Sequence, residues 1–300
     1  MSSPPLWTLL RGCVCGSGLG ALSDAFVAAT LMQLLPTPAP SAPHVLYIGT
    51  ATYDDAGAAA AQTARLREAG CVIAHLELSR APPPRAVREA AIEAADIVVV
   101  SGGNSLYMLD TWRALGVDAA LRRAVARGVV LGGGSAGLGW LFDGLHSDSA
   151  DPTTFRLAAP PSGDWRYVRV PALGILPGLV TPHADQTQSN GVLRGADAEA
   201  MLRRHAGERL WAVDHWAALR MDGAGGFRVL ALPGRERAGG GAPGIVVKDV
   251  RADGTIEARA LPAEGRLADW LRCAEVIVED PAVGAVREAN PAVCVKEGAA

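Results

Sequence analysis

Short apolar runs alternate with longer amphipathic segments through the first half of the chain. Strands are expected at 45–49, 71–78, 96–100 and 129–131, and all but the one at 71–78 are expected to be buried, since those runs are short, apolar and rich in β-branched residues. Helices are expected between them at 56–69, 82–95 and 106–127, the last with a break near Gly116. Strands that alternate with helices in this way predict βαβ units and a parallel sheet covered on both faces.

The segment before these βαβ units and the second half of the chain follow a different pattern. A first strand with a glycine turn, a helix at 23–35 and a Pro-rich linker precede the βαβ units. The second half predicts short strands, turns and two helices, at 187–205 and 263–273. No clean linker separates the halves, so we expect one domain over 1–280 and a flexible tail over 281–300.

Composition narrows the class of protein. The 300 residues are 49% hydrophobic and 20% charged, with a net charge of −3, and no basic stripe suggests a nucleic-acid partner. Arg11 and Asp24 interrupt the apolar N-terminal stretch, which excludes a membrane span there. That stretch also lacks the charged start of a secretory signal, so we expect a cytoplasmic protein with reduced thiols. A homodimer is compatible with this composition, but no motif argues for one.

The pentapeptide Gly133-Gly134-Ser135-Ala136-Gly137 follows the strand expected at 129–131. Glycines on both sides of a serine allow a tight turn between a strand and a helix, with the hydroxyl exposed at its tip. This is the pattern of a nucleophile elbow, G-x-S-x-G, and the apolar residues after it predict that a helix opens there. A plain structural or phosphate-binding turn is the alternative, so the rest of the chain must supply a base, an acid and an oxyanion hole.

A second glycine-rich strand end lies at Ser101-Gly102-Gly103-Asn104. Ligands of open parallel sheets bind outside the carboxyl ends of the strands, so this segment and the elbow should face one crevice. Gly102 or Gly103 could then donate a backbone N–H to an oxyanion, with Ala136 as the second donor. Asn104 is suited both to cap a helix and to contact a substrate.

His183 is the best candidate for the base, because it follows an apolar strand and a proline after the elbow. His146 is its rival, but it follows the elbow closely. Asp148 and Asp185 are the candidates for the acid, and Asp185 shares one face of an extended segment with His183. Asp143 and Asp151 are weaker candidates.

The order of these segments, with Leu173-Gly-Ile-Leu-Pro-Gly178 before Pro182-His183, resembles the peptidase E group of serine peptidases, family S51. The resemblance covers roughly residues 45–232. It implies a flavodoxin-like fold, similar to class I glutamine amidotransferases, with a mostly parallel sheet, helices on both faces and small antiparallel additions in the C-terminal part. It also implies Ser135 as nucleophile, His183 as base, Asp148 as acid, and oxyanion and substrate contacts from Gly102, Gly103 and Asn104. Asp214 matches a second acidic position of the family.

The resulting hypothesis is a serine peptidase that hydrolyses a small peptide or isopeptide through Ser135, His183 and Asp148, without a metal or organic cofactor. The resemblance implies a preference for an N-terminal aspartate, which needs a cationic pocket. No motif locates that pocket, and the candidates are Arg156, Arg166, Arg169 and Arg194. Two alternatives stay open: another serine hydrolase, such as an amidase or esterase, and a catalytically silent binding protein on the same fold.

Overall fold

The computed structural model describes residues 4–156, 164–205, 207–274 and 279–292. Its main sheet has eight strands in the order β14-β11-β10-β1-β5-β4-β2-β3. Five of them pair in parallel: β1 (Arg11–Cys15), β5 (Val130–Gly134), β4 (Ile97–Val100), β2 (His44–Ile48) and β3 (Val72–His75). The antiparallel extension consists of β10 (Ala217–Asp222), β11 (Gly226–Ala231) and β14 (Glu264–Arg266).

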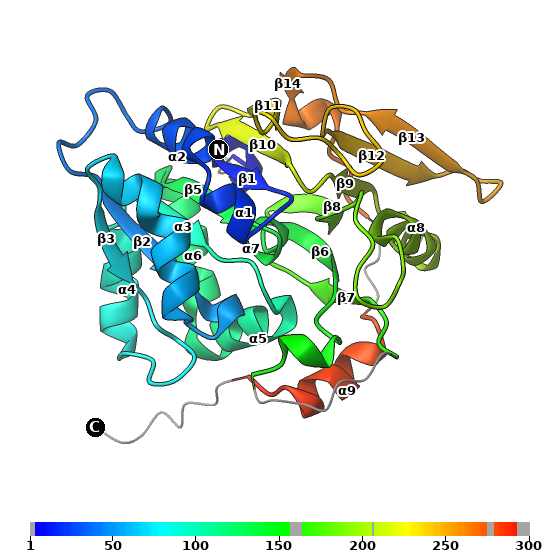
Figure 1. Cartoon of the computed structure of the whole chain (residues 1–300), viewed down its shortest axis with the longest axis horizontal. Helices are drawn as coiled ribbons and strands as arrows, with labels where there is room; N and C mark the ends of the chain where they lie inside the picture. Colours follow the sequence, from blue (N-terminus) through cyan, green and yellow to red (C-terminus); the bar gives the residue numbers. More distant parts are fainter. Residues whose placement is uncertain (1–3, 157–163, 206, 275–278, 293–300) are drawn as a thin grey trace.

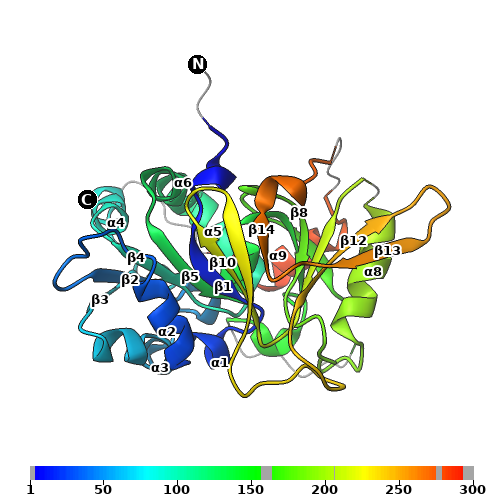
Figure 2. The same ribbon diagram turned by 90° about the horizontal axis from the view of Figure 1, so that it is seen from above.

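Helices cover both faces of the parallel part of this sheet (Figure 2). One face carries α1 (Leu19–Leu22), α2 (Ala25–Met32) and α3 (Ala56–Glu68), and the other carries α4 (Arg85–Glu93), α5 (Ser105–Leu115) and α6 (Val117–Arg127). Alternate residues of β4 belong to two separate cores: Ile97 and Val99 pack with the first group, and Val98 and Val100 with the second. This burial on both faces explains why β4 is a continuous apolar run.

A second, six-stranded sheet has the order β13-β12-β9-β8-β6-β7 and lies beside the main one (Figure 1). Its strands are β6 (Phe142–Ser147), β7 (Val168–Pro171), β8 (Leu176–Thr181), β9 (Leu210–Val213), β12 (Ile245–Val250) and β13 (Ile256–Ala260). Strands β6, β8 and β9 are mutually parallel, and the outer strands are antiparallel. Helix α8 (Arg194–Arg204) buries Met201 and Leu202 against this sheet.

A bidentate ion pair is buried within the second sheet. The Arg169 guanidinium, on β7, donates to both carboxylate oxygens of Glu208 at 2.9 and 2.6 Å. Both side chains are almost fully buried, at 0% and 1% exposure. Arg169 is therefore a structural residue and is not free to form a cationic substrate pocket.

Three expected elements differ in the structure. The helix after Ser135 is a single turn, α7 (Ala136–Gly139), because the apolar residues after it enter the buried strand β6. The helix expected at 187–205 begins only at Arg194, since the residues before it include the exposed Val192 and Leu193 and have no buried face. The helix expected at 263–273 is wrong: β14 pairs there with β11, and a short 3-10 helix, η4 (Leu267–Asp269), follows.

The flexible tail expected from residue 281 is replaced by helix α9 (Ala282–Ala289), which lies against β7 (Figure 1). Val283 is fully buried, and Arg287 donates to the Asp110 carboxylate of α5 at 2.7 Å. The Asn290 side chain donates to the Tyr53 hydroxyl at 2.9 Å. These contacts depend on partners far away in the sequence, so the local pattern does not reveal them. Residues 293–300 of the expected tail lie outside the described residues.

None of the helices in the described part of the chain combines the length and the apolarity that a bilayer crossing requires.

Candidate active site

The parallel strands of both sheets end at one shared pocket of about 450 Å³. On the main-sheet side its wall includes residues just after the carboxyl ends of β1, β4 and β5: Ser17, Gly102, Gly103 and Ser135. On the other side it includes residues after β6, β8 and β9: Asp148, His183 and His215. Carboxyl ends of parallel strands are the usual place for ligands in α/β proteins, and here two such edges meet.

Ser135 occupies the tip of the strand–turn–helix segment. Its backbone has φ 56° and ψ −112°, an uncommon conformation for a residue with a side chain. The Ser135 N–H donates to the carbonyl of Cys15, and the Ser135 carbonyl accepts from Leu138 and Gly139, the last two residues of α7. The backbone on both sides therefore fixes the strained residue, and its half-buried side chain reaches the pocket.

Glycines are required around this turn because backbone carbonyls of α7 and β4 pass very close. A Cβ on Gly133 would lie 2.0 Å from the Gly137 carbonyl oxygen, and one on Gly137 would lie 2.2 Å from that of Val100. The G-x-S-x-G pattern therefore meets a packing demand in addition to forming the turn.

The segment after β4 lies next to Ser135. A Cβ on Gly102 would lie 3.3 Å from the Ser135 Cβ, and Gly103 has a positive φ of 123°. Ala136 is the first residue of α7, so its N–H has no acceptor within the helix. Gly102 and Gly103 therefore line the same pocket as Ser135, and the donor role of the Gly103 and Ala136 N–H groups stays a prediction.

Asn104 is placed differently from the glycines before it. Its side-chain oxygen accepts from Tyr107 N at the start of α5, and its amide nitrogen donates to the Thr154 hydroxyl at 2.9 Å. The residue is 1% exposed. The capping role is confirmed, whereas a substrate contact by Asn104 stays a prediction.

His183 follows β8 with a positive φ of 51° and faces a second histidine. Its Nδ1 lies 2.7 Å from Nδ1 of His215, which follows the neighbouring strand β9. Burial holds the pKa of His183 well below its ordinary value, and the charges of Arg194 and His215 lower it further, against a smaller raising effect of Asp185. His183 is therefore neutral at pH 7, as a general base must be.

Asp148 reaches the same pocket from the end of β6, but its carboxylate forms an ion pair with Arg194. Its Oδ2 accepts from Arg194 Nη1 at 2.8 Å, and Arg194 Nη2 donates to the carbonyl of His146. Arg194 is 1% exposed and lies behind Asp148, which lines the pocket. The role of Asp148 as the acid stays a prediction from the resemblance.

Asp185, the other candidate acid, accepts the backbone N–H groups of His215 and Ala238 at 2.7 and 2.8 Å. Burial alone would raise its pKa, but these donors and the Gln186 amide outweigh burial and keep the pKa below its ordinary value. Asp185 thus fixes the backbone of His215 through a hydrogen bond.

His146, the rival base, lies on β6 and is fully buried outside the pocket wall. Its ring nitrogens contact Thr181 Oγ1 at 3.1 Å and Asp197 Oδ1 at 3.0 Å. Burial lowers its pKa to about 4, although Asp197 acts in the opposite direction. These hydrogen bonds connect β6 with β8 and α8, so His146 has a structural role.

Comparison with known proteins identifies the family. The model of Peptidase family S51 matches residues 18–229. The chain belongs to peptidase family S51. This membership makes it a serine peptidase, as the sequence predicted.

Two curated relatives are similar to this S51 chain. A Trypanosoma brucei brucei protein named G2/mitotic-specific cyclin-1 is 28% identical, with 94% of each chain covered. The uncharacterized peptidase YgaJ of Bacillus subtilis (strain 168) is 31% identical over 48% of this chain and 55% of its own length.

Solved structures support the predicted fold. A putative peptidase E from Listeria monocytogenes EGD-e aligns with a TM-score of 0.54 at 15% identity, covering 74% of this chain and 98% of that one. A peptidase from an acI-B1 Actinobacterium aligns with a TM-score of 0.52 at 18% identity, covering 86% and 97%. The flavodoxin-like, amidotransferase-like prediction is confirmed.

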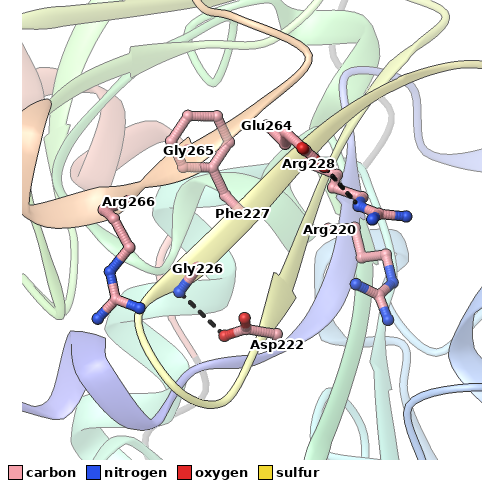
Figure 3. Close-up of a pocket in the computed structure, with 8 residues that line it drawn as sticks. All are labelled: Arg220, Asp222, Gly226, Phe227, Arg228, Glu264, Gly265 and Arg266. Atoms are coloured by element: carbon pink, nitrogen blue, oxygen red, sulfur yellow. Dashed lines mark hydrogen bonds and ion pairs between the residues drawn. The ribbon is translucent and has the colours of Figure 1, made fainter.

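The S51 chain also has a larger hollow, of about 610 Å³, on the antiparallel extension of the main sheet (Figure 3). Charged side chains dominate its wall: Arg220, Asp222, Arg228, Glu264 and Arg266. Among the described residues that line it there is no serine, cysteine, threonine or histidine, so it offers no hydroxyl, thiol or imidazole nucleophile for a serine-type mechanism. The same described part of the chain contains no cluster of three or more His, Cys, Asp or Glu side chains that could hold a metal ion.

Sequence reasoning missed His215 at the S51 site. The only signal in the sequence for a function of His215 is its position directly after the apolar run at 210–213. The strand pairing of β8 with β9 turns that position into a neighbour of His183.

Proposed function

We propose that this S51 peptidase hydrolyses short peptides or isopeptides by nucleophilic attack of Ser135, with His183 as the general base and acid. The observation that carries the proposal is the strained elbow conformation of Ser135 in a pocket that also holds a neutral histidine. Acyl transfer needs a fixed serine and a neutral imidazole in one pocket, and Ser135 and His183 both line this one.

The proposed reaction has two halves. Ser135 Oγ attacks the scissile carbonyl carbon while its proton passes to His183, and the C–N bond then breaks as His183 gives that proton to the leaving amine. Water next attacks the acyl-enzyme and loses a proton to His183, which returns it to Ser135 as the acid product leaves. The serine and the histidine are thus restored after each turnover.

The oxyanion of both tetrahedral intermediates is assigned to the backbone N–H groups of Ala136 and Gly103. The close approach of the Gly102 backbone to Ser135 supports this assignment. Loss of one such donor typically lowers kcat on the order of 10²–10³-fold.

The resemblance implies Asp148 as the triad acid, but the Asp148 carboxylate accepts from Arg194 and the Nδ1 of His183 contacts His215. An Asp148→Asn substitution tests it: a triad acid that holds the histidine tautomer should cost on the order of 10⁴-fold in kcat. A much smaller loss would limit Asp148 to its pairing with Arg194 and exclude it as the acid.

The substrate side of the proposal is a short peptide, with N-terminal aspartate as the first residue to test. Arg194 is the candidate cation that we test first, because its guanidinium pairs with the pocket-lining Asp148. An aspartyl substrate would have to compete with Asp148 for that cation. A panel of Asp-X, Ala-X and Lys-X dipeptides therefore tests this preference directly.

The test of the chemistry is labelling with a reactive serine probe, a fluorophosphonate, followed by the dipeptide panel and a set of acyl esters. Wild type should label and hydrolyse peptides, whereas Ser135→Ala and His183→Ala should do neither. His75→Phe is the matched control, since His75 is exposed on β3 away from the pocket.

Turnover of the acyl esters without peptides would point to an esterase or amidase. Equal activity of Ser135→Ala and wild type on the same substrate would exclude Ser135 as the nucleophile. Silence of wild type in every assay would favour a binding protein.

A further inference from the structure

We propose that His215 is a positioning residue for His183, accepting the His183 Nδ1–H in the place that a carboxylate holds in a Ser-His-Asp triad. The proposal rests on the proposed function, because it assigns a partner to the base of that reaction. The observation behind it is the 2.7 Å contact between the two Nδ1 atoms.

The protons on this pair have one productive arrangement. A neutral imidazole carries one N–H and one lone pair, so at this distance one ring donates and the other accepts. If His183 donates from Nδ1, its Nε2 keeps the lone pair and can take the Ser135 proton. If His215 donates instead, the proton of His183 stays on Nε2, which then cannot act as a base. His215 therefore assists catalysis as a hydrogen-bond acceptor.

The surroundings hold the His215 ring in place. Asp185, two residues after His183, accepts the His215 backbone N–H at 2.7 Å and so ties the two histidine segments together. The Trp216 ring packs edge-on against the His215 ring, with centroids 4.4 Å apart. The Arg235 guanidinium in turn stacks over the Trp216 ring, 4.4 Å from its centroid. A ring held in this way loses little freedom when it accepts the hydrogen bond.

A neutral acceptor also changes how the base titrates. His183 faces Arg194, His215 and Asp185, and His215 faces Asp185 and Arg235. A carboxylate at position 215 would add a negative charge beside the imidazolium and favour it, whereas the neutral imidazole of His215 does not. The identity of residue 215 should therefore set the acid limb of the pH–rate profile.

Three substitutions separate positioning from packing: His215→Phe, His215→Asn and His215→Glu. Phenylalanine keeps an aromatic ring against Trp216 but removes the acceptor, and should lower kcat by about 10²-fold with little change in KM. Asparagine restores an acceptor oxygen and should recover part of that loss. Glutamate should move the acid limb of kcat/KM to higher pH, because it raises the pKa of His183.

A second measurement does not depend on knowing the substrate. The proton shared by the two Nδ1 atoms should give a downfield imidazole N–H resonance in the proton NMR spectrum. Ser135→Ala should keep this resonance, whereas His183→Ala and His215→Phe should both lose it.

The outcomes distinguish this proposal from the proposed function. Undiminished kcat and an unchanged pH profile in His215→Phe, with the downfield resonance retained, would reduce His215 to a packing residue while Ser135 and His183 stand. Hydrolysis by Ser135→Ala at the wild-type rate would instead overturn the function itself. His75→Phe again controls for the loss of an imidazole elsewhere in the fold.

Discussion

The two walls of the pocket are built on different principles. The main-sheet wall presents backbone: two glycines after β4 and the turn that holds Ser135. The second-sheet wall presents ionisable side chains, Asp148, His183 and His215, fixed by Arg194 and Asp185. The first wall positions Ser135 through backbone strain and close packing. The second wall carries the groups that can transfer protons, and burial and nearby charges set their pKa values. Substitutions on the two walls should therefore differ in kind.

The largest effect is expected at the strained serine. Ser135→Gly should abolish turnover, by on the order of 10⁴-fold or more, because the nucleophile is lost. It should at the same time stabilise the fold by roughly 1 kcal/mol or more, since glycine accepts φ 56° without strain. Thermal unfolding and kcat, measured beside Ser135→Ala, separate these effects. A Ser135→Gly protein less stable than Ser135→Ala would contradict the account of stored strain.

The buried ion pair of the second sheet should give the next largest effect, on stability alone. Glu208→Gln leaves the Arg169 charge buried without a partner and should cost about 3–5 kcal/mol of unfolding free energy. Neither residue lines the pocket, so kcat per folded molecule should stay near wild type. Glu68→Gln, at an exposed pair with Arg65, is the control and should change stability by less than about 1 kcal/mol. Equal costs at the two sites would refute the distinction.

Acid should destabilise the second-sheet side through His146. Its pKa of about 4 in the folded state lies below the ordinary value of about 6.5, so the unfolded chain binds the proton more readily. The free energy of unfolding should fall as pH drops from about 6.5 toward 4, and His146 should account for about 3 kcal/mol of that loss. Urea unfolding across this range measures it, and His146→Gln should flatten the dependence. If the free energy of unfolding of His146→Gln depends on pH as steeply as that of wild type, other groups cause the effect.

The smallest effect is expected from crowding the main-sheet wall. Gly102→Ala adds a Cβ 3.2 Å from the Gly134 carbonyl oxygen and 3.3 Å from the Ser135 Cβ, which should lower kcat by about 10–10²-fold. The pH profile should keep its shape, because no ionisable group is altered. Gly284→Ala, where a Cβ meets nothing within 4 Å, is the matched control. A shifted acid limb in Gly102→Ala would mean that the two walls are not separable.

The sequence predicted the main-sheet wall better than the other one. The elbow and the glycines after β4 are local patterns, since each needs only a strand end and small residues. A local pattern also singles out His183, because it follows an apolar strand and a proline, and its role as the base stays a prediction. Its contact with His215 and the pairing of Asp148 with Arg194 depend on the order of β6, β8 and β9 and on where α8 begins. Such long-range choices follow from packing, which one-dimensional periodicity does not encode.

The position of β1 has a consequence for how the molecule assembles. This N-terminal strand lies between β5 and β10, so residues 11–15 pair with partners near positions 130 and 220. During synthesis the strand beside the elbow must wait until most of the chain has left the ribosome before both its edges are paired. Loop closure over such distances is slow, and the unpaired edge stays open to wrong partners meanwhile. We therefore expect folding of the catalytic centre to be a late event that benefits from a chaperone.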